Sequence, residues 1–270
     1  MISFPNAKIN IGLNITEKRA DGFHNIESVF YPINLADILE INPSENLIFK
    51  NTGLLIENGD FNHNLCFKAF QFLQKDFAIP PVQIHLHKII PSGAGLGGGS
   101  SDASFMLKLL NQVFELKLNN NQLENYAGQI GSDCPFFITN QPAYVTEKGN
   151  NIKSLSLNLK GYFIVLVHPG IHINTGQAYS KIKPAKPENS LKELINQPIE
   201  KWKNLIKNDF ESVVFKEFDD IRKIKEKLYD SGALYASMSG SGSSVYGIFN
   251  EKTELKKVFP DYFVWGDFLT

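Results

Sequence analysis

The chain has 270 residues, with 43% hydrophobic and 20% charged residues, which is typical of a globular protein with one large or two ordinary domains. Its formal net charge of −1 does not favour a nucleic-acid partner. We expect no signal peptide, because the first residues show no basic region followed by an apolar run, and no membrane partner, because no apolar run reaches the roughly 18 residues that a membrane span needs. The two cysteines, Cys66 and Cys134, form no metal or redox pattern, and a cytoplasmic protein is expected.

The N-terminal segment is predicted to begin with a strand over residues 7–15, because apolar and polar side chains alternate there with a period of two. Lys8 and Asn10 fall on the polar face of this strand. They either line a functional site or belong to a half-buried edge strand. Further short strands are expected at residues 29–33, 36–42 and 47–51.

A polar loop follows the strand predicted over residues 7–15 and ends in two ring side chains. Asp21-Gly22 is a turn signal, and Phe23 and His24 come directly after it. Either Phe23 packs into the core while His24 caps the turn, or the two side chains form a platform and a hydrogen-bonding group for a heterocyclic base.

A glycine-rich segment, residues 91–101, stands between a strand predicted over 82–90 and a helix predicted over 100–116. Glycine has no Cβ, so its N–H groups can crowd around one ligand, and the unpaired N–H groups of a helix start add a positive dipole end. The segment therefore predicts a phosphate cradle rather than a flexible linker. Its members are Pro91, Ser92, Gly93, Ala94, Gly95, Leu96, Gly97, Gly98, Gly99, Ser100 and Ser101.

Three further features stand near this segment. A largely buried helix is expected over 64–76, and Asp102 is expected in the first turn of the helix after the glycines, where the helix dipole favours an acid. Asp133 follows a short helix over 122–130, and it is either a capping residue or a functional carboxylate.

The second half of the chain is predicted to alternate strands and helices as in a two-layer α+β sandwich. Thr175 is a candidate helix N-cap, and the small-residue loop 237–244 is long enough to favour close approach of its backbone to another group. Strands are expected at 144–148, 162–167, 233–237, 245–249 and 262–266, and helices at 191–196, 200–208, 212–231 and 251–259.

The type of phosphate loop follows from the residues around the glycines. A Walker loop needs a Lys after its last Gly, and Ser100 stands there instead. The dinucleotide fingerprint is matched from Gly93 onward, but Glu115, the acid at the right spacing, ends a helix rather than a strand. The pattern Pro-x3-Gly-Leu-Gly-x-x-Ser, in which glycines and serines wrap a nucleoside triphosphate ahead of a helix, fits residues 91–101.

Five motifs in this order resemble those of the GHMP kinases, a superfamily of small-molecule kinases. The resemblance covers nearly the whole chain, and it is closest to members that act on a cytidine-diphosphate-linked methylerythritol in the non-mevalonate isoprenoid pathway. It implies an α+β fold with a ribosomal-protein-like N-terminal domain over 1–153 and a ferredoxin-like C-terminal sandwich over 154–270. The motifs are Pro5-Asn-Ala-Lys-Ile-Asn10, Arg19-Ala-Asp-Gly-Phe-His24, residues 93–102, Gly131-Ser-Asp-Cys-Pro135 and residues 239–244.

The resemblance also implies roles for the reacting groups. Asp133 becomes the general base on the substrate hydroxyl, Lys8 its charged partner, and Asn10 a residue near the same hydroxyl. A Lys beside an Asp favours the ionised carboxylate and can stabilise the emerging alkoxide. The glycine segment would hold the phosphates of ATP. Contacts around the adenine are expected from Asn64 and Lys88.

Substrate recognition is implied in the same way. Phe23 and Tyr179 would sandwich the cytosine, and His24 would read its polar edge. The family often has Tyr at position 23, so stacking survives here while a hydroxyl contact does not. Residues expected near the substrate and its diphosphate are Thr175, Gly240, Ser241, Gly242 and Ser243.

The implied cofactors are ATP and Mg²⁺. Some relatives hold the metal with a Glu that has no clear counterpart here, so the metal ligands stay unassigned, with Ser100 or Ser101 as candidates. The partner is expected to be a small-molecule substrate, and the chain a monomer or weak homodimer. The alternatives are a kinase for another alcohol such as mevalonate or homoserine, a non-catalytic nucleotide-binding module, and an NAD-dependent dehydrogenase.

Overall fold

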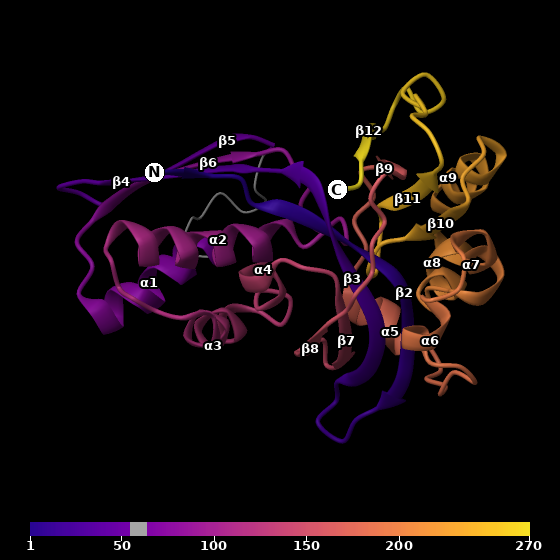
Figure 1. Cartoon of the computed structure of the whole chain (residues 1–270), viewed down its shortest axis with the longest axis horizontal. Helices are drawn as coiled ribbons and strands as arrows, with labels where there is room; N and C mark the ends of the chain where they lie inside the picture. Colours follow the sequence, from indigo (N-terminus) through magenta and orange to yellow (C-terminus); the bar gives the residue numbers. More distant parts are fainter. Residues whose placement is uncertain (55–63) are drawn as a thin grey trace. The chain divides into compact units, whose positions relative to one another are not determined.

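The computed structural model describes residues 1–54 and 64–270 (Figure 1). The contacts within the chain define two compact units, each built from separate stretches of sequence. The domain boundary expected at residue 153 assumes two continuous halves, and it stays a prediction. Unit 1 comprises Met1–Lys8, Leu35–Ser92 and Gly97–Gln141, and unit 2 comprises Ile9–Asn34, Gly93–Leu96 and Pro142–Thr270.

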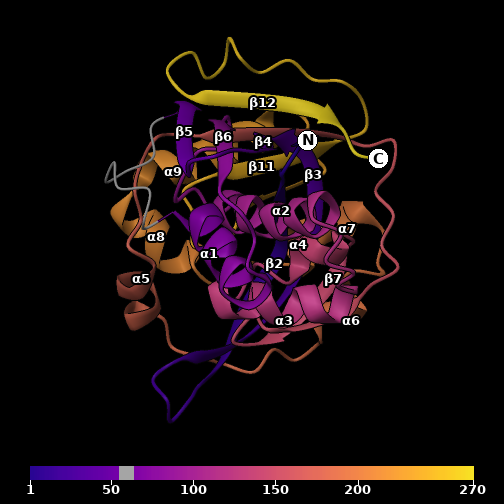
Figure 2. The same ribbon diagram turned by 90° about the vertical axis from the view of Figure 1, so that its left-hand side faces the viewer.

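Unit 1 is a four-stranded sheet covered by helices. The strand order is β1-β4-β6-β5, with β5 parallel to β6 and the other pairs antiparallel. Helices α1, α2 and α3 lie on one side of this sheet, as both ribbon views show (Figure 2). The elements are β1 (Ile2–Ser3), β4 (Ile38–Pro43), β5 (Ile48–Gly53), β6 (Val82–Lys88), α1 (Leu65–Phe77), α2 (Gly98–Val113), α3 (Asn120–Ile130) and α4 (Phe136–Thr139).

The helix after the glycine segment begins two residues earlier than predicted, at Gly98. The reason is Gly97, which adopts the left-handed conformation (φ 70°) and forms the N-cap. Asp102 therefore lies beyond the first turn, and the prediction that it belongs to that turn is wrong. The N-termini of the other two long helices follow ordinary capping, with Asn64 on α1 and Asn119 on α3.

Unit 2 contains a second and a third sheet. The first of them has the order β2-β3-β7-β8, and the other has the antiparallel order β10-β11-β9-β12. The short strand β8 lies in a polar stretch where the sequence analysis predicted no strand. The strands are β2 (Asn6–Lys18, whose first three residues belong to unit 1), β3 (His24–Ala36, whose last two residues belong to unit 1), β7 (Ala143–Glu147), β8 (Asn151–Ser154), β9 (Phe163–His168), β10 (Tyr235–Met238), β11 (Val245–Phe249) and β12 (Phe263–Phe268).

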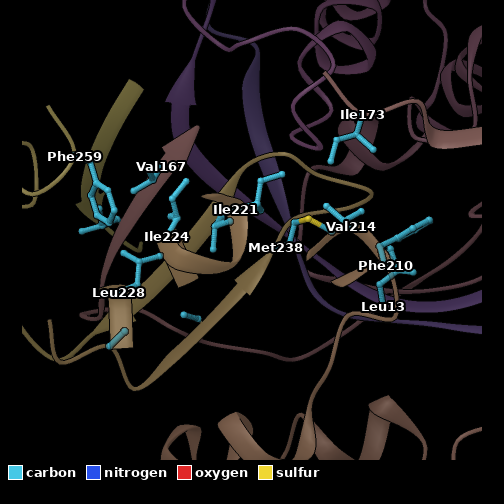
Figure 3. Close-up of a cluster of buried hydrophobic side chains, with 14 of the residues drawn as sticks. Leu13, Val167, Ile173, Phe210, Val214, Ile221, Ile224, Leu228, Met238 and Phe259 are labelled. Carbon is cyan, nitrogen blue, oxygen red and sulfur yellow. The ribbon is translucent and has the colours of Figure 1, made fainter. Parts of the chain in front are cut away.

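The core of unit 2 forms where α9 packs on the third sheet (Figure 3). Ile221, Ile224 and Leu228 are buried at helical spacing on α9. The single helix predicted over 212–231 is two helices, because Phe218 adopts a non-helical conformation between them. The helices are α5 (Thr175–Lys181), α6 (Leu191–Leu194), α7 (Ile199–Leu205), α8 (Glu211–Glu217) and α9 (Asp219–Asp230).

Two further predictions in unit 2 are wrong. No helix forms over 251–259, where the chain makes turns that bury Leu255 and Phe259 in the core. A helix of nine residues is marginal without a packed face, so burial of these two side chains decides the local conformation. Thr175 is not an N-cap, because Asn174 caps α5 by accepting a hydrogen bond from the N–H of Gln177. Within the described residues, no helix is both long and apolar enough to cross a membrane.

Candidate active site

Unit 1 holds the predicted reacting pair. Lys8 Nζ lies 3.6 Å from Asp133 Oδ2. The Lys8 side chain is 4% exposed, whereas that of Asp133 is 33% exposed. Burial lowers the pKa of Lys8, and the charge of Asp133 offsets part of that effect. The pair therefore combines an ammonium fixed inside the protein with a carboxylate that a substrate can reach.

The segment that carries Asp133 is attached to α2. Ser104 Oγ donates a hydrogen bond to the Cys134 carbonyl at 2.6 Å. The N–H of Cys134 in turn donates to the Gly131 carbonyl, which closes a turn around Asp133. The Cys134 thiol is buried, and burial raises its pKa to about 12, so it is inert rather than nucleophilic.

The start of α2 is an open phosphate cradle. No side chain caps it, and the first backbone hydrogen bond of the helix runs from the Ser101 N–H to the Gly97 carbonyl. The N–H groups of the first turn are therefore left for a ligand. A Cβ on Gly97 would lie 2.9 Å from Phe137 and 3.3 Å from Lys8 Cε, which places the lysine stem against the helix start.

A second charged cluster, Asp37–Lys88–Asp102, lies buried in the same unit. Lys88 Nζ pairs with Asp37 Oδ2 and, at 2.7 Å, with Asp102 Oδ2. Burial opposes the charged ammonium, but Asp102 and Asp37 outweigh it and raise the pKa of Lys88. Burial raises the pKa of Asp102 to about 7, against the opposing pull of Lys88. The sequence did not single out Asp37, which lies between two strands with no motif around it.

The two residues expected near adenine take different places in unit 1. Asn64 is half-buried, and its side chain accepts the N–H of Cys66. Lys88 is 5% exposed and its ammonium is occupied by two carboxylates, an arrangement that favours a structural role. Both adenine contacts stay predictions.

Unit 2 contains the other part of the glycine segment, Gly93–Leu96, and joins it to Asn10 and the loop after β10. Ser239 Oγ donates to the Gly95 carbonyl at 2.8 Å and accepts the N–H of Asn10 at 3.2 Å. A Cβ on Gly95 would lie 2.0 Å from the Ser239 carbonyl, so only glycine fits there. The Asn10 side chain donates to Ser28 Oγ at 2.9 Å.

The loop 240–243 lies next to Thr175, and the expected contacts of both with the substrate stay predictions. Thr175 Oγ1 lies 2.8 Å from Ser241 Oγ, and both side chains belong to unit 2. Ser243 is fully buried, and its hydroxyl donates to the Ile171 carbonyl at 2.5 Å. Asn208, which the sequence analysis missed, donates to the Met238 and Gly240 carbonyls at 2.8 and 2.9 Å. Buried asparagines of this kind have no sequence signal of their own.

The three residues expected to bind the base, Phe23, His24 and Tyr179, all belong to unit 2. Phe23 is 61% exposed, with Lys148 Nζ 5.0 Å from the centre of its ring. His24 stacks on Tyr179 with ring centroids 5.0 Å apart and planes at 15°. A cytosine sandwiched by Phe23 and Tyr179 would therefore need the His24 ring to turn away from Tyr179. Burial, with a smaller effect of Lys18, lowers the pKa of His24, which favours a neutral imidazole.

The described residues offer no protein cage for a divalent cation. No group of three or more His, Cys, Asp or Glu side chains gathers among them. Mg²⁺ commonly keeps several waters and binds through nucleotide phosphates and one or two protein oxygens. Ser101 Oγ is buried and has no hydrogen-bond partner within the described part of the chain, so this hydroxyl fits such a role.

Comparison with known proteins defines the class. The GHMP kinases N terminal domain matches residues 64–141, and the GHMP kinases C terminal domain matches residues 190–261. The chain belongs to the GHMP kinase family. It is thus a small-molecule kinase, and membership of this family implies the use of ATP.

Individual members of the family show which kinases the chain is similar to. A Bacteroides fragilis protein named 4-diphosphocytidyl-2-C-methyl-D-erythritol kinase is 52% identical over 262 residues, which cover 96% of this chain and 95% of that protein. A crystal structure of 4-(cytidine 5'-diphospho)-2C-methyl-D-erythritol kinase matches with a TM-score of 0.83 and 27% identity over 98% of both chains. Mevalonate kinase from Methanococcus jannaschii shares the fold, with a TM-score of 0.68 and 18% identity over 100% of this chain and 98% of its own. The predicted α+β fold is confirmed.

Proposed function

We propose that the chain transfers the γ-phosphoryl group of ATP to the 2-hydroxyl of 4-diphosphocytidyl-2-C-methyl-D-erythritol, giving the 2-phosphate and ADP in non-mevalonate isoprenoid precursor biosynthesis. The observation that carries this proposal is the Lys8–Asp133 pair beside the uncapped start of α2. A reacting pair and a phosphate cradle in one unit are what phosphoryl transfer requires. The choice of substrate follows the relatives that are about 50% identical along the chain.

Asp133 acts as the base in this reaction. Its partly exposed carboxylate accepts the proton of the substrate hydroxyl as the oxygen attacks the γ-phosphorus. Lys8 Nζ stabilises the alkoxide and the charge that develops on the transferred group. Because the Lys8 stem packs against Gly97, the ammonium is fixed relative to the helix start that holds the phosphates.

Mg²⁺ bound to ATP would neutralise charge on the β- and γ-phosphates. The N–H groups at the start of α2 hold the same phosphates, and the Ser101 hydroxyl is the protein oxygen that we assign to the metal or its phosphate ligands.

Unit 2 supplies recognition of the cytidine part. Phe23 offers an exposed ring for the cytosine, and His24 offers an uncharged polar edge after it leaves Tyr179. Thr175, Asn10 and the loop 240–243 supply hydroxyl, amide and backbone groups for the rest of the substrate.

Release of ADP from Mg-ATP tests the proposal, with 4-diphosphocytidyl-2-C-methyl-D-erythritol, mevalonate and homoserine offered separately. We expect turnover with the cytidine compound and none above background with the other two alcohols. Turnover with mevalonate or homoserine alone would assign the chain to another branch of the family. Failure with all three while ATP still binds would favour a non-catalytic module.

A further inference from the structure

The strongest unassigned feature is the position of Asp37, which joins two segments that carry reacting groups. This carboxylate is completely buried in unit 1. Its Oδ1 accepts the N–H groups of Ile89 and Ile90, at 2.5 and 2.8 Å. These residues immediately precede Pro91, the first residue of the glycine segment.

The backbone N–H of Asp37 is hydrogen-bonded to the segment that leads into the strand with Lys8. This N–H donates to the Pro5 carbonyl at 2.9 Å, three residues before Lys8. One residue thereby connects the entry to the Lys8 strand with the entry to the phosphate loop. We call Pro5, Asp37, Ile89 and Ile90 the Asp37 junction.

A charged cluster fixes the orientation of this carboxylate. Asp37 Oδ2 pairs with Lys88, and Lys88 pairs with Asp102 on α2 at 2.7 Å. A Cβ on Gly98 would lie 3.4 Å from Lys88 Nζ, so the ammonium lies against the first helical residue of the phosphate cradle. Hydrogen bonds between N–H groups and an ionised carboxylate are about twice as strong as neutral ones.

We propose that Asp37 is a positioning residue for phosphoryl transfer, which holds Lys8 and the phosphate loop in register. It touches no reacting atom and acts through the Ile89 and Ile90 N–H groups, the Pro5 carbonyl and Lys88. The inference rests on the proposed function, because it assigns Lys8 and the glycine segment to the transfer of phosphate. Misplacement of a reacting group by about 1 Å can cost as much as 100-fold in rate.

The test compares Asp37→Ala and Asp37→Asn with Ile84→Ala, a control in the same strand as Lys88 that removes buried apolar contacts without touching the junction. For Asp37→Ala we expect kcat to fall about 10-fold or more and the KM for ATP to rise. The KM for the cytidine substrate should stay within about twofold, because its recognition groups belong to unit 2. Asp37→Asn keeps one acceptor oxygen, so its kcat should lie between those of the wild type and Asp37→Ala.

Hydrogen exchange of the Ile89 and Ile90 amides gives a second readout without activity. We expect faster exchange in both Asp37 variants and wild-type exchange in Ile84→Ala. If Asp37→Ala does not fold, Asp37→Asn decides alone: wild-type exchange together with wild-type kcat overturns the proposal. Equal losses of kcat in Asp37→Ala and in Ile84→Ala also overturn it. An inactive wild-type protein would refute the proposed function instead, while the amide exchange would still report on the junction.

Discussion

Unit 1 contains two lysine–aspartate clusters that differ in their surroundings. In one, Lys8 faces the single carboxylate of Asp133, which is 33% exposed. In the other, Lys88 lies between Asp37 and Asp102, and none of the three side chains is more than 5% exposed. The first carboxylate can reach a substrate, and the second pair cannot.

This difference in exposure assigns a catalytic role to the first cluster and a structural role to the second. A base must exchange its proton with a ligand, so Asp133 needs an open side. The buried cluster instead joins α2, the end of β6 and the chain before β4, and Asp37 uses its second oxygen on backbone N–H groups. We therefore expect changes at the first cluster to lower the rate directly, and changes at the second to lower stability and to affect the rate only through the positions of Lys8 and the phosphate loop.

The largest expected effect is on the reaction rate, at the Lys8–Asp133 pair, which we call the open cluster. Asp133→Asn removes the base, and kcat should fall by about 10²–10⁴-fold. Binding of ATP, measured by calorimetry, should persist. The buried Lys8 ammonium loses its anion, but because Asp133 is partly exposed the melting temperature should fall less than in a variant of the fully buried cluster. Wild-type kcat in this variant would refute the role of Asp133 as the base.

The next effect is on stability at the buried cluster. Lys88→Met leaves two carboxylates buried without a cation, and we expect a loss of about 3–5 kcal/mol in the free energy of unfolding. Lys8→Met is the matched variant, since both lysines are buried. It should lose activity while costing less stability. Urea denaturation measures both, and equal losses would contradict the distinction between the clusters.

A smaller effect on the kinetic constants is expected at Gly97, the N-cap of α2, against which the Lys8 side chain packs. Gly97→Ala places a methyl group 2.9 Å from Phe137 at a residue with φ 70°, where a side chain costs about 1–2 kcal/mol. We expect a higher KM for ATP and a lower kcat. Gly99→Ala is the control, because among the residues that the structure describes a Cβ there meets only Leu65, at 3.8 Å. The same kinetic loss in both variants would argue against a specific role for Gly97.

The smallest effect is a pH dependence of stability. Burial raises the pKa of Asp102 to about 7, from an ordinary value of 3.8, with Lys88 opposing and Asp37 adding to the shift. Between these values the folded state holds a proton that the unfolded chain has lost, so the contribution of Asp102 to stability falls as pH rises. Cys66 on α1 also interacts with Asp102, and burial raises the pKa of this thiol well above its ordinary range.

Asp102→Asn removes this titration. The melting temperature of the variant relative to the wild type should therefore rise by a few degrees from pH 5 to pH 8. A constant difference across that range would show that Asp102 does not titrate there. It would contradict the idea that burial changes the ionisation of the second cluster.

Much of this site could be predicted from the sequence because its parts are local motifs. The glycine segment, the Lys8 strand and the Asp133 turn each have a pattern that short-range chemistry explains. The structure brings Lys8 to Asp133 and Thr175 to Ser241. The individual substrate and nucleotide contacts stay predictions.

The residues that the sequence analysis missed act through long-range contacts. Asp37 lies 52 and 53 positions before its amide partners, and Asn208 lies 30 and 32 positions before its carbonyl partners. A single Asp or Asn between elements has no periodicity or spacing that announces such contacts. The helix wrongly predicted over 251–259 failed for a related reason, since burial of Leu255 and Phe259 outweighed local propensity.

Phosphorus NMR of the reaction product tests the central claim most directly. With Mg-ATP and 4-diphosphocytidyl-2-C-methyl-D-erythritol, the wild-type protein should produce one new phosphomonoester signal on the tertiary 2-hydroxyl, leave the cytidine diphosphate signals in place and release one ADP per product. The Asp133→Asn variant should give no such signal over the same time. ADP release without a new phosphomonoester, or the same product yield from the variant, would contradict the account.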